Sequence, residues 1–273
     1  MTVKRVLAIG GGEDKENESE ILKKFVELAG GDDAEILIMT VATKEVEETI
    51  KDYRKVFRRL HAGSVKAFDV SMREDTAAKK GLQLIENATG IFFTGGDQLD
   101  IASLLGGTTM LETLKQRHCS GCVIAGTSAG AAMMSKSMLI SGKPEESPRF
   151  GNVEIGPGLD FISETIIDTH FSQRGRCGRL MTAVAHYPQD IGIGIDEDTA
   201  ILVNNGTEFR VIGSGSVIIV DGGPMTHTNL ADLEHGEPLE LHDLSLHVLP
   251  AGARYDLRKQ RPIVERRKRR AAA

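Results

Sequence analysis

The sequence predicts an α/β protein built on a mostly parallel sheet with helices on both sides, and with antiparallel hairpins added in its C-terminal third. Apolar runs of strand length alternate with charged amphipathic stretches, and several of these runs end in glycine. Alternation of this kind is typical of βαβ units around a parallel sheet. The 273 residues are 40% hydrophobic and 26% charged, which is ordinary for a globular chain with a sizeable core.

The elements of the first half follow one another in strict alternation. Strands are expected at residues 5–9, 35–41, 64–70, 90–94 and 122–126, and helices at 18–29, 45–60, 76–87 and 110–118, where apolar residues recur at helical spacing. Short strands at 190–195, 200–204, 208–213 and 216–220 are separated by turn signals, which predicts hairpins at the far edge of the same sheet. We expect one domain over residues 1–257 and a basic, disordered tail over 258–273.

Composition excludes several classes of protein. The chain has no Trp and only 4% aromatic residues, and its formal charge is −6, so a nucleic-acid-binding core is not expected. No apolar run approaches the ~18 residues that span a bilayer, and the N-terminus lacks the pattern of a signal peptide. We therefore expect a cytoplasmic protein. The three cysteines are interpreted as reduced thiols, because the CxxC spacing at 119–122 has no supporting metal or redox context.

The glycine run at residues 10–12 follows the first strand and invites comparison with cofactor-binding loops. It lacks the GxGxxG spacing and a Walker lysine, and an acidic cluster comes next (Glu13, Asp14, Glu16, Glu18 and Glu20), which would repel a pyrophosphate. We interpret the run as a tight turn and expect no cofactor.

The most informative motif is GTSAG at 126–130, which lies between an apolar strand and a helical run. A sharp strand-to-helix turn exposes the hydroxyl of Ser128, and the flanking glycines relieve clashes at the turn. The backbone N–H of Ala129 then points to where an oxyanion would form. A packing turn is the alternative interpretation. Together these features predict a serine nucleophile at a nucleophile elbow.

A serine nucleophile needs a base, and His170 is the best of the eight histidines because it lies at an expected strand end, where α/β folds gather their chemistry. Three arginines follow, and Arg is the usual partner of carboxylates. An upstream glycine-rich strand end at 92–98 offers Gly95 and Gly96 for the oxyanion hole. The candidate substrate-binding residues are Asp97, Gln98, Asp168, Gln173, Arg174, Arg176 and Arg179. Capping of the next helix by Asp97 and a solvated charged turn for the arginines remain alternatives.

Four segments resemble the cyanophycinase family of serine peptidases, which also contains the α-aspartyl dipeptidases. They are FFTGGDQ at 92–98, GTSAGA at 126–131, DTHFSQRGRCGRL at 168–180 and GIGIDEDTA at 192–200. The resemblance implies a flavodoxin-like fold similar to that of class I glutamine amidotransferases. It also implies exopeptidase hydrolysis of cyanophycin, a polyaspartate that carries arginine on its β-carboxyls, to β-aspartyl-arginine dipeptides.

Residue by residue, the resemblance matches Ser128 to the nucleophile and His170 to the general base of a catalytic triad. It places the acid of the triad at Glu146. Glu145 and Glu197 remain alternatives, because only proximity to the histidine decides which carboxylate orients it. It further implies a homodimer, and the chemistry calls for no metal. An α-aspartyl dipeptidase and a catalytically dead binding protein of the same fold remain alternative functions.

The charge is unevenly distributed along the chain. Residues 258–270 contain 8 of the 33 basic residues and one acid, which leaves 25 basic and 38 acidic residues, a formal −13, in the remainder. An acidic body suits a polymer that displays arginine. The basic tail could bind nucleic acid electrostatically, although a solvated tail is the simpler interpretation.

Overall fold

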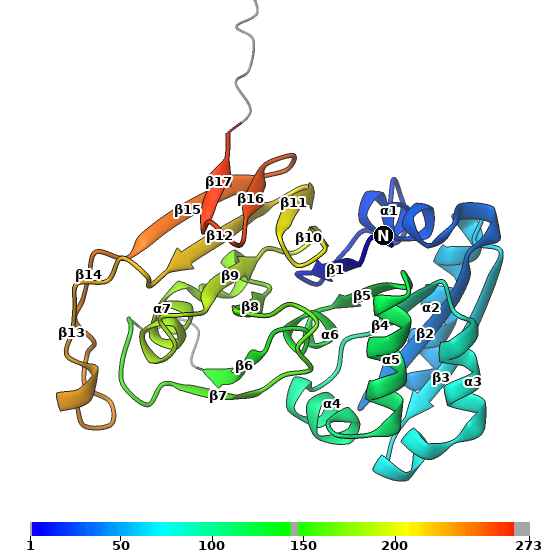
Figure 1. The fold of residues 1–273 in the computed structure, drawn as a ribbon, viewed down its shortest axis with the longest axis horizontal. Helices are drawn as coiled ribbons and strands as arrows, with labels where there is room; N and C mark the ends of the chain where they lie inside the picture. Colours follow the sequence, from blue (N-terminus) through cyan, green and yellow to red (C-terminus); the bar gives the residue numbers. More distant parts are fainter. Residues whose placement is uncertain (1, 143–146, 265–273) are drawn as a thin grey trace, which may run out of the picture.

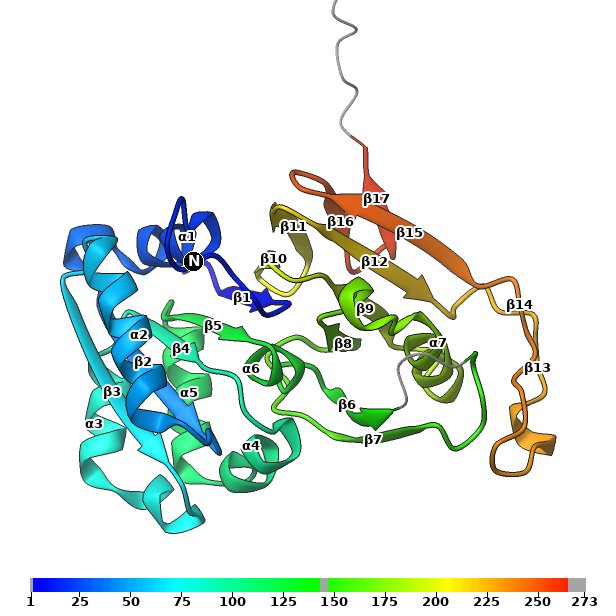
Figure 2. The same ribbon diagram turned by 180° about the vertical axis from the view of Figure 1, so that it is seen from behind.

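A computed structural model describes residues 2–142 and 147–264. Its largest sheet has nine strands in the order β17-β16-β11-β10-β1-β5-β4-β2-β3 (Figures 1 and 2). Strands β1, β5, β4, β2 and β3 are parallel to one another. The remaining four strands extend the sheet from β1 by antiparallel pairing. The bounds are β1 (Arg5–Ile9), β2 (Glu35–Val41), β3 (Ser64–Val70), β4 (Gly90–Phe93), β5 (Val123–Thr127), β10 (Thr199–Asn204), β11 (Glu208–Gly213), β16 (Arg254–Asp256) and β17 (Arg261–Ile263).

Helices cover both faces of the parallel part of this sheet. Apolar residues of α1 (Glu20–Ala29) and α2 (Val46–Arg59) share one core cluster with inward residues of the strands, and α2 lies in front of the sheet in Figure 2. The opposite core cluster takes residues from α3 (Lys79–Asn87), α4 (Gln98–Leu105) and α5 (Thr109–Cys119), and α5 lies in front in Figure 1. Because strand residues alternate between the faces, both clusters draw on the same strands.

The predicted α/β class and mostly parallel sheet are confirmed, and the expected strands and helices of the first half are present within one or two residues. One helix differs, because the run at 76–87 is divided into the 3₁₀ helix η2 (Arg73–Ala77) and α3. Ala78 between them is extended, with φ −66° and ψ 120°. Short 3₁₀ turns also occur at η1 (Gly31–Asp33), η3 (Ser172–Arg174) and η4 (Leu230–Asp232).

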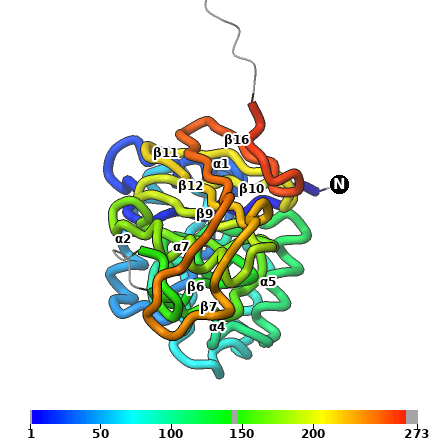
Figure 3. Tube along the Cα trace, turned by 90° about the vertical axis from the view of Figure 1, so that its left-hand side faces the viewer, coloured from blue at the N-terminus to red at the C-terminus, as the bar shows by residue number. Residues whose placement is uncertain are grey.

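The prediction that the later strands all extend one sheet is wrong. Of the four strands expected over residues 190–220, β10 and β11 join the large sheet, whereas β9 (Ile191–Ile195) and β12 (Ser216–Asp221) belong to a second sheet in the order β15-β12-β9-β8. Its other strands are β8 (Thr165–Thr169) and β15 (Ser245–Pro250), and α7 (Cys177–His186) packs on it, toward the viewer in Figure 3. A turn after β9 carries the chain from the small sheet to the large one.

Two pairs of short strands complete the described chain: β6 (Ser137–Gly142) with β7 (Val153–Pro157), and β13 (His227–Thr228) with β14 (Leu241–His242). The disordered tail is expected to begin at residue 258, but residues 261–263 form β17, which pairs with β16 at the edge of the large sheet. Residues 265–273 lie outside the described residues. No helix in the described part of the chain is long and apolar enough to cross a membrane.

Candidate active site

Ser128 lies at a strained turn between β5 and the short helix α6 (Ala129–Ala132), with φ 54° and ψ −118°. The flanking glycines are required by close backbone contacts. A Cβ on Gly126 would lie 2.2 Å from the carbonyl oxygen of Gly130, and one on Gly130 would lie 2.7 Å from that of Phe93. Strained backbone of this kind persists only where the surrounding structure enforces it. The geometry of the turn is that of a nucleophile elbow.

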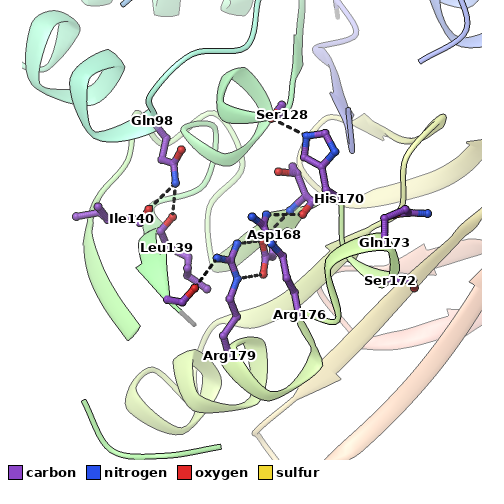
Figure 4. Close-up of polar contacts among 12 residues, drawn as sticks. Gln98, Ser128, Leu139, Ile140, Asp168, His170, Ser172, Gln173, Arg176 and Arg179 are labelled. Atoms are coloured by element: carbon purple, nitrogen blue, oxygen red, sulfur yellow. Dashed lines mark hydrogen bonds and ion pairs between the residues drawn. The ribbon is translucent and has the colours of Figure 1, made fainter. Parts of the chain in front are cut away.

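His170 directly follows β8 and points its ring at the serine (Figure 4). The distance from Ser128 Oγ to His170 Nε2 is 2.9 Å. The backbone N–H of His170 donates to the carbonyl of Gly10 over 2.8 Å, and a Cβ on Gly11 would lie 2.3 Å from the imidazole. A glycine at position 11 therefore makes room for the ring beside Ser128.

Glu197 occupies the other side of the imidazole, with 2.6 Å between His170 Nδ1 and Glu197 Oε1. The parallel pairing of β8 with β9 explains this contact, because both residues come shortly after the carboxyl ends of neighbouring strands. The Glu197 side chain is 42% exposed and that of His170 only 13%. Glu145 and Glu146, the other two candidates, lie outside the described residues. Glu197 is the one of the three acids that the described structure brings to the histidine.

The residues expected to form the oxyanion hole differ in how close they lie to Ser128. Gly95 is close, since a Cβ there would lie 3.7 Å from Ser128 Cβ, and Ala129 is the first residue of α6. Gly96 packs instead on the end of β2, where its Cβ would lie 3.0 Å from the carbonyl oxygens of Val41 and Ala42. Both glycines line a pocket of about 820 Å³. The charged side chains around this pocket are Lys44, Glu45, Asp97 and Asp100.

Asp97 and Gln98 both have partners within the protein. The Asp97 carboxylate caps α4, where it accepts from the backbone N–H groups of Leu99 at 2.8 Å and Asp100 at 3.2 Å. The Gln98 amide donates to the β6 carbonyls of Leu139 at 3.3 Å and Ile140 at 2.5 Å (Figure 4). The cap that the sequence offered as an alternative for Asp97 is present, and Gln98 ties α4 to β6.

The expectation that Asp168 is available to a substrate cation is not supported by its contacts. Its side chain is 2% exposed and accepts from Arg179 Nε at 2.6 Å, from Arg179 Nη2, and from Arg176 Nη1 at 3.2 Å (Figure 4). Arg176 also donates to the carbonyl of Thr169 at 2.6 Å. Burial lowers the pKa of the Arg176 guanidinium to about 10, and the charge of Asp168 opposes this effect. These three residues form an internal ionic cluster beneath His170.

We expect Asp168→Ala to lower the free energy of unfolding by about 3–5 kcal/mol, because it leaves the buried guanidinium of Arg179 without the carboxylate that balances its charge. Denaturant unfolding followed by circular dichroism measures this loss. The matched control is Asp232→Ala at an exposed aspartate in η4, which should stay within about 0.5 kcal/mol of the unchanged protein. Equal effects of the two substitutions would contradict a stabilising role for the cluster.

Gln173 and Arg174 differ from the buried arginines because both are exposed on η3. The Gln173 side-chain oxygen accepts from the backbone N–H of Glu197 over 3.0 Å and so supports the loop of the acid. The Arg174 guanidinium has no hydrogen-bond or ion-pair partner among the described residues. Of the three arginines that follow His170, Arg174 is therefore the one that is free to meet a ligand.

Sequence reasoning missed one buried acid near the serine. Glu13 follows the glycine run and accepts a hydrogen bond of 2.7 Å from the hydroxyl of Thr127, the residue before Ser128. In the sequence Glu13 is one of five acids in a cluster, and the only signal that distinguishes it is its position directly after three glycines.

The three cysteines are free thiols, and burial raises the pKa of Cys122 to about 12. No metal-binding group of His, Cys, Asp or Glu is found within the described ranges.

The chain is similar to a known peptidase family and to individual proteins within it. The profile of Peptidase family S51 matches residues 6–212. A cyanophycinase of Geminocystis herdmanii is 41% identical over 259 residues, covering 94% of this chain and 95% of the relative. A cyanophycinase of Trichormus variabilis is 41% identical over 253 residues, covering 92% of this chain and 85% of the relative.

Two solved structures are similar in fold. A peptidase from an acI-B1 Actinobacterium has a TM-score of 0.68 and 22% identity, covering 93% of this chain and 97% of that structure. A putative peptidase E protein from Listeria monocytogenes EGD-e has a TM-score of 0.52 and 15% identity, covering 77% of this chain and 98% of that structure. At these identities the two structures support the fold alone.

Proposed function

Because the chain belongs to peptidase family S51, and is thus a hydrolase, we propose that it is a serine-type exopeptidase that hydrolyses cyanophycin to β-aspartyl-arginine dipeptides. The observation that carries the proposal is the linear arrangement of Ser128, His170 and Glu197, with hydrogen-bond distances of 2.9 and 2.6 Å. A hydroxyl, an imidazole and a carboxylate in this order form the arrangement that activates serine in unrelated hydrolases. The relatives named cyanophycinase support the choice of substrate.

In the proposed mechanism, His170 Nε2 takes the proton of Ser128 as Oγ attacks a backbone carbonyl of the polymer. The carboxylate of Glu197 holds Nδ1 protonated and stabilises the imidazolium that forms. The backbone N–H groups of Ala129 and of Gly95 or Gly96 stabilise the oxyanion. His170 then protonates the leaving amine, and water activated by the same ring releases the acyl group from Ser128.

The charges around the site favour a zwitterionic substrate. The pocket beside Gly95 and Gly96 is lined by charges of both signs, one cation (Lys44) and three acids (Glu45, Asp97 and Asp100). Each repeating unit of cyanophycin presents a guanidinium and a free carboxylate. We propose that Arg174 binds the carboxylate, because the other two arginines are occupied by Asp168. The guanidinium would then face the acids of the pocket.

Mass analysis of the products tests this function. We expect incubation with purified cyanophycin to release β-aspartyl-arginine, and we expect little hydrolysis of α-linked Asp-Xaa dipeptides under the same conditions. The reverse preference would identify an aspartyl dipeptidase. A lack of hydrolysis with both substrates, together with a lack of labelling of Ser128 by a fluorophosphonate, would identify a binding protein without catalytic activity.

A further inference from the structure

Glu13 is a buried carboxylate that the proposed reaction does not use. Its side chain is only 2% exposed. Oε2 accepts from Thr127 Oγ1 at 2.7 Å, Oε1 accepts from the hydroxyl of Tyr53 on α2, and the ammonium of Lys15 lies 3.9 Å from Oε1. Burying a charge is costly unless it is well hydrogen-bonded, so a group with this many partners calls for an explanation.

The chemistry of the partners fixes the direction of both hydrogen bonds. Burial raises the pKa of the Tyr53 phenol well above 10, and the charge of Glu13 raises it further. Tyr53 therefore remains protonated and donates. Thr127 donates to the other oxygen, so the carboxylate joins α2, the loop after β1 and the last residue of β5.

The end of β1 and the loop after it, which carries Glu13, accept backbone hydrogen bonds from Ser128, from His170 and from the neighbour of Glu197. The carbonyl of Ile9 accepts from the N–H of Ser128 at 3.0 Å, that of Gly10 from His170 at 2.8 Å, and that of Gly11 from Asp198 at 2.9 Å. Gly12 packs against the side chain of Glu197, since a Cβ there would lie 3.1 Å from Oε2. One short segment thus supports groups that come from three different strand ends.

We propose that Glu13 is a positioning residue for the nucleophile: by binding Thr127 and Tyr53 it holds residues 10–13 against the elbow, and this keeps Ser128 Oγ aligned with His170 Nε2. The proposal rests on the proposed function only in that Ser128 is the nucleophile. Alignment of reacting groups is sensitive to shifts of an ångström or less, so loss of this anchor should act on the rate of attack rather than on substrate binding.

Glu13→Gln tests the proposal, with Glu18→Gln as the matched control because Glu18 is an exposed acid of the same loop. The readouts are the rate of Ser128 labelling by a fluorophosphonate, kcat and KM for cyanophycin, and the thermal melt. We expect a single cooperative melt, labelling and kcat lowered on the order of tenfold, and KM within about twofold of the control. Labelling at the control rate, or a loss fully explained by unfolded protein, would overturn the proposal.

A second pair of variants covers the case in which Glu13→Gln does not fold. Thr127→Val removes the hydrogen bond to Glu13 and keeps the volume, whereas Thr127→Ser keeps the hydroxyl. We expect slow labelling with valine and recovery with serine, and equal labelling of the two would overturn the proposal. Because the fluorophosphonate needs no cyanophycin, a protein that is labelled but leaves the polymer intact contradicts the proposed substrate without affecting the test of Glu13.

Discussion

Ser128→Ala is expected to lower the release of β-aspartyl-arginine by on the order of 10⁴-fold or more, because it removes the atom on which the proposed acyl-enzyme forms. The fold should persist, since among the described residues the side chain of Ser128 forms a hydrogen bond with His170 alone. Dipeptide release from purified cyanophycin, measured by mass spectrometry against time, gives the rate. The thermal melt of the same sample checks the fold.

The matched control for this substitution is Ser120→Ala. Ser120 is exposed at the end of α5, and its hydroxyl donates to the carbonyl of Gln116 at 2.9 Å, so its loss should leave turnover within about twofold. Turnover of Ser128→Ala near that of the unchanged protein would exclude an acyl-enzyme on this residue.

Glu197→Gln is expected to lower kcat by on the order of 10³-fold while the protein stays folded. An amide can donate to Nδ1 of His170, which stabilises the tautomer that carries its proton on Nε2. In that tautomer the ring cannot accept the proton of Ser128. Steady-state kinetics with cyanophycin measures the loss, and a KM close to that of the unchanged protein would place the effect on the chemical step.

The controls for this substitution are Glu146→Gln, which tests the acid that the family resemblance favours, and Glu145→Gln, which tests its neighbouring alternative. We expect both variants to keep turnover within about threefold of the unchanged protein, because His170 Nδ1 already has a partner at 2.6 Å. A larger loss for Glu146→Gln than for Glu197→Gln would return the acid's role to Glu146.

The parallel part of the large sheet could be predicted closely because β1, β2, β4 and β5 are buried along nearly their whole length and read as apolar runs. The edge strand β3 is only partly buried, and its alternation of apolar with polar residues still marks it as a strand. β1, β2 and β3 match the expected bounds. The small sheet could not be predicted, since β9 and β12 have the same local pattern as β10 and β11. Which sheet a short strand joins depends on long-range pairing, and the sequence pattern contains no information on it.

The candidate site shows the same division between local and long-range information. Ser128 could be found from its glycine neighbours, and His170 from its place at a strand end. The choice of Glu146 over Glu197 rested on resemblance, whereas the contact of Glu197 with the ring follows from the pairing of β8 with β9. Similarly, the sequence shows that Asp168 and the arginines are charged but not that they bind one another.

The proposed nucleophile and its base come from different sheets. Ser128 follows β5 of the nine-stranded sheet, whereas His170 and Glu197 follow β8 and β9 of the four-stranded one. A relative shift of the two sheets by an ångström would separate Oγ from Nε2 and leave every strand intact. The activity of this chain therefore depends on the relative position of the two sheets. A substitution that shifts one sheet against the other can abolish hydrolysis while the secondary structure is unchanged.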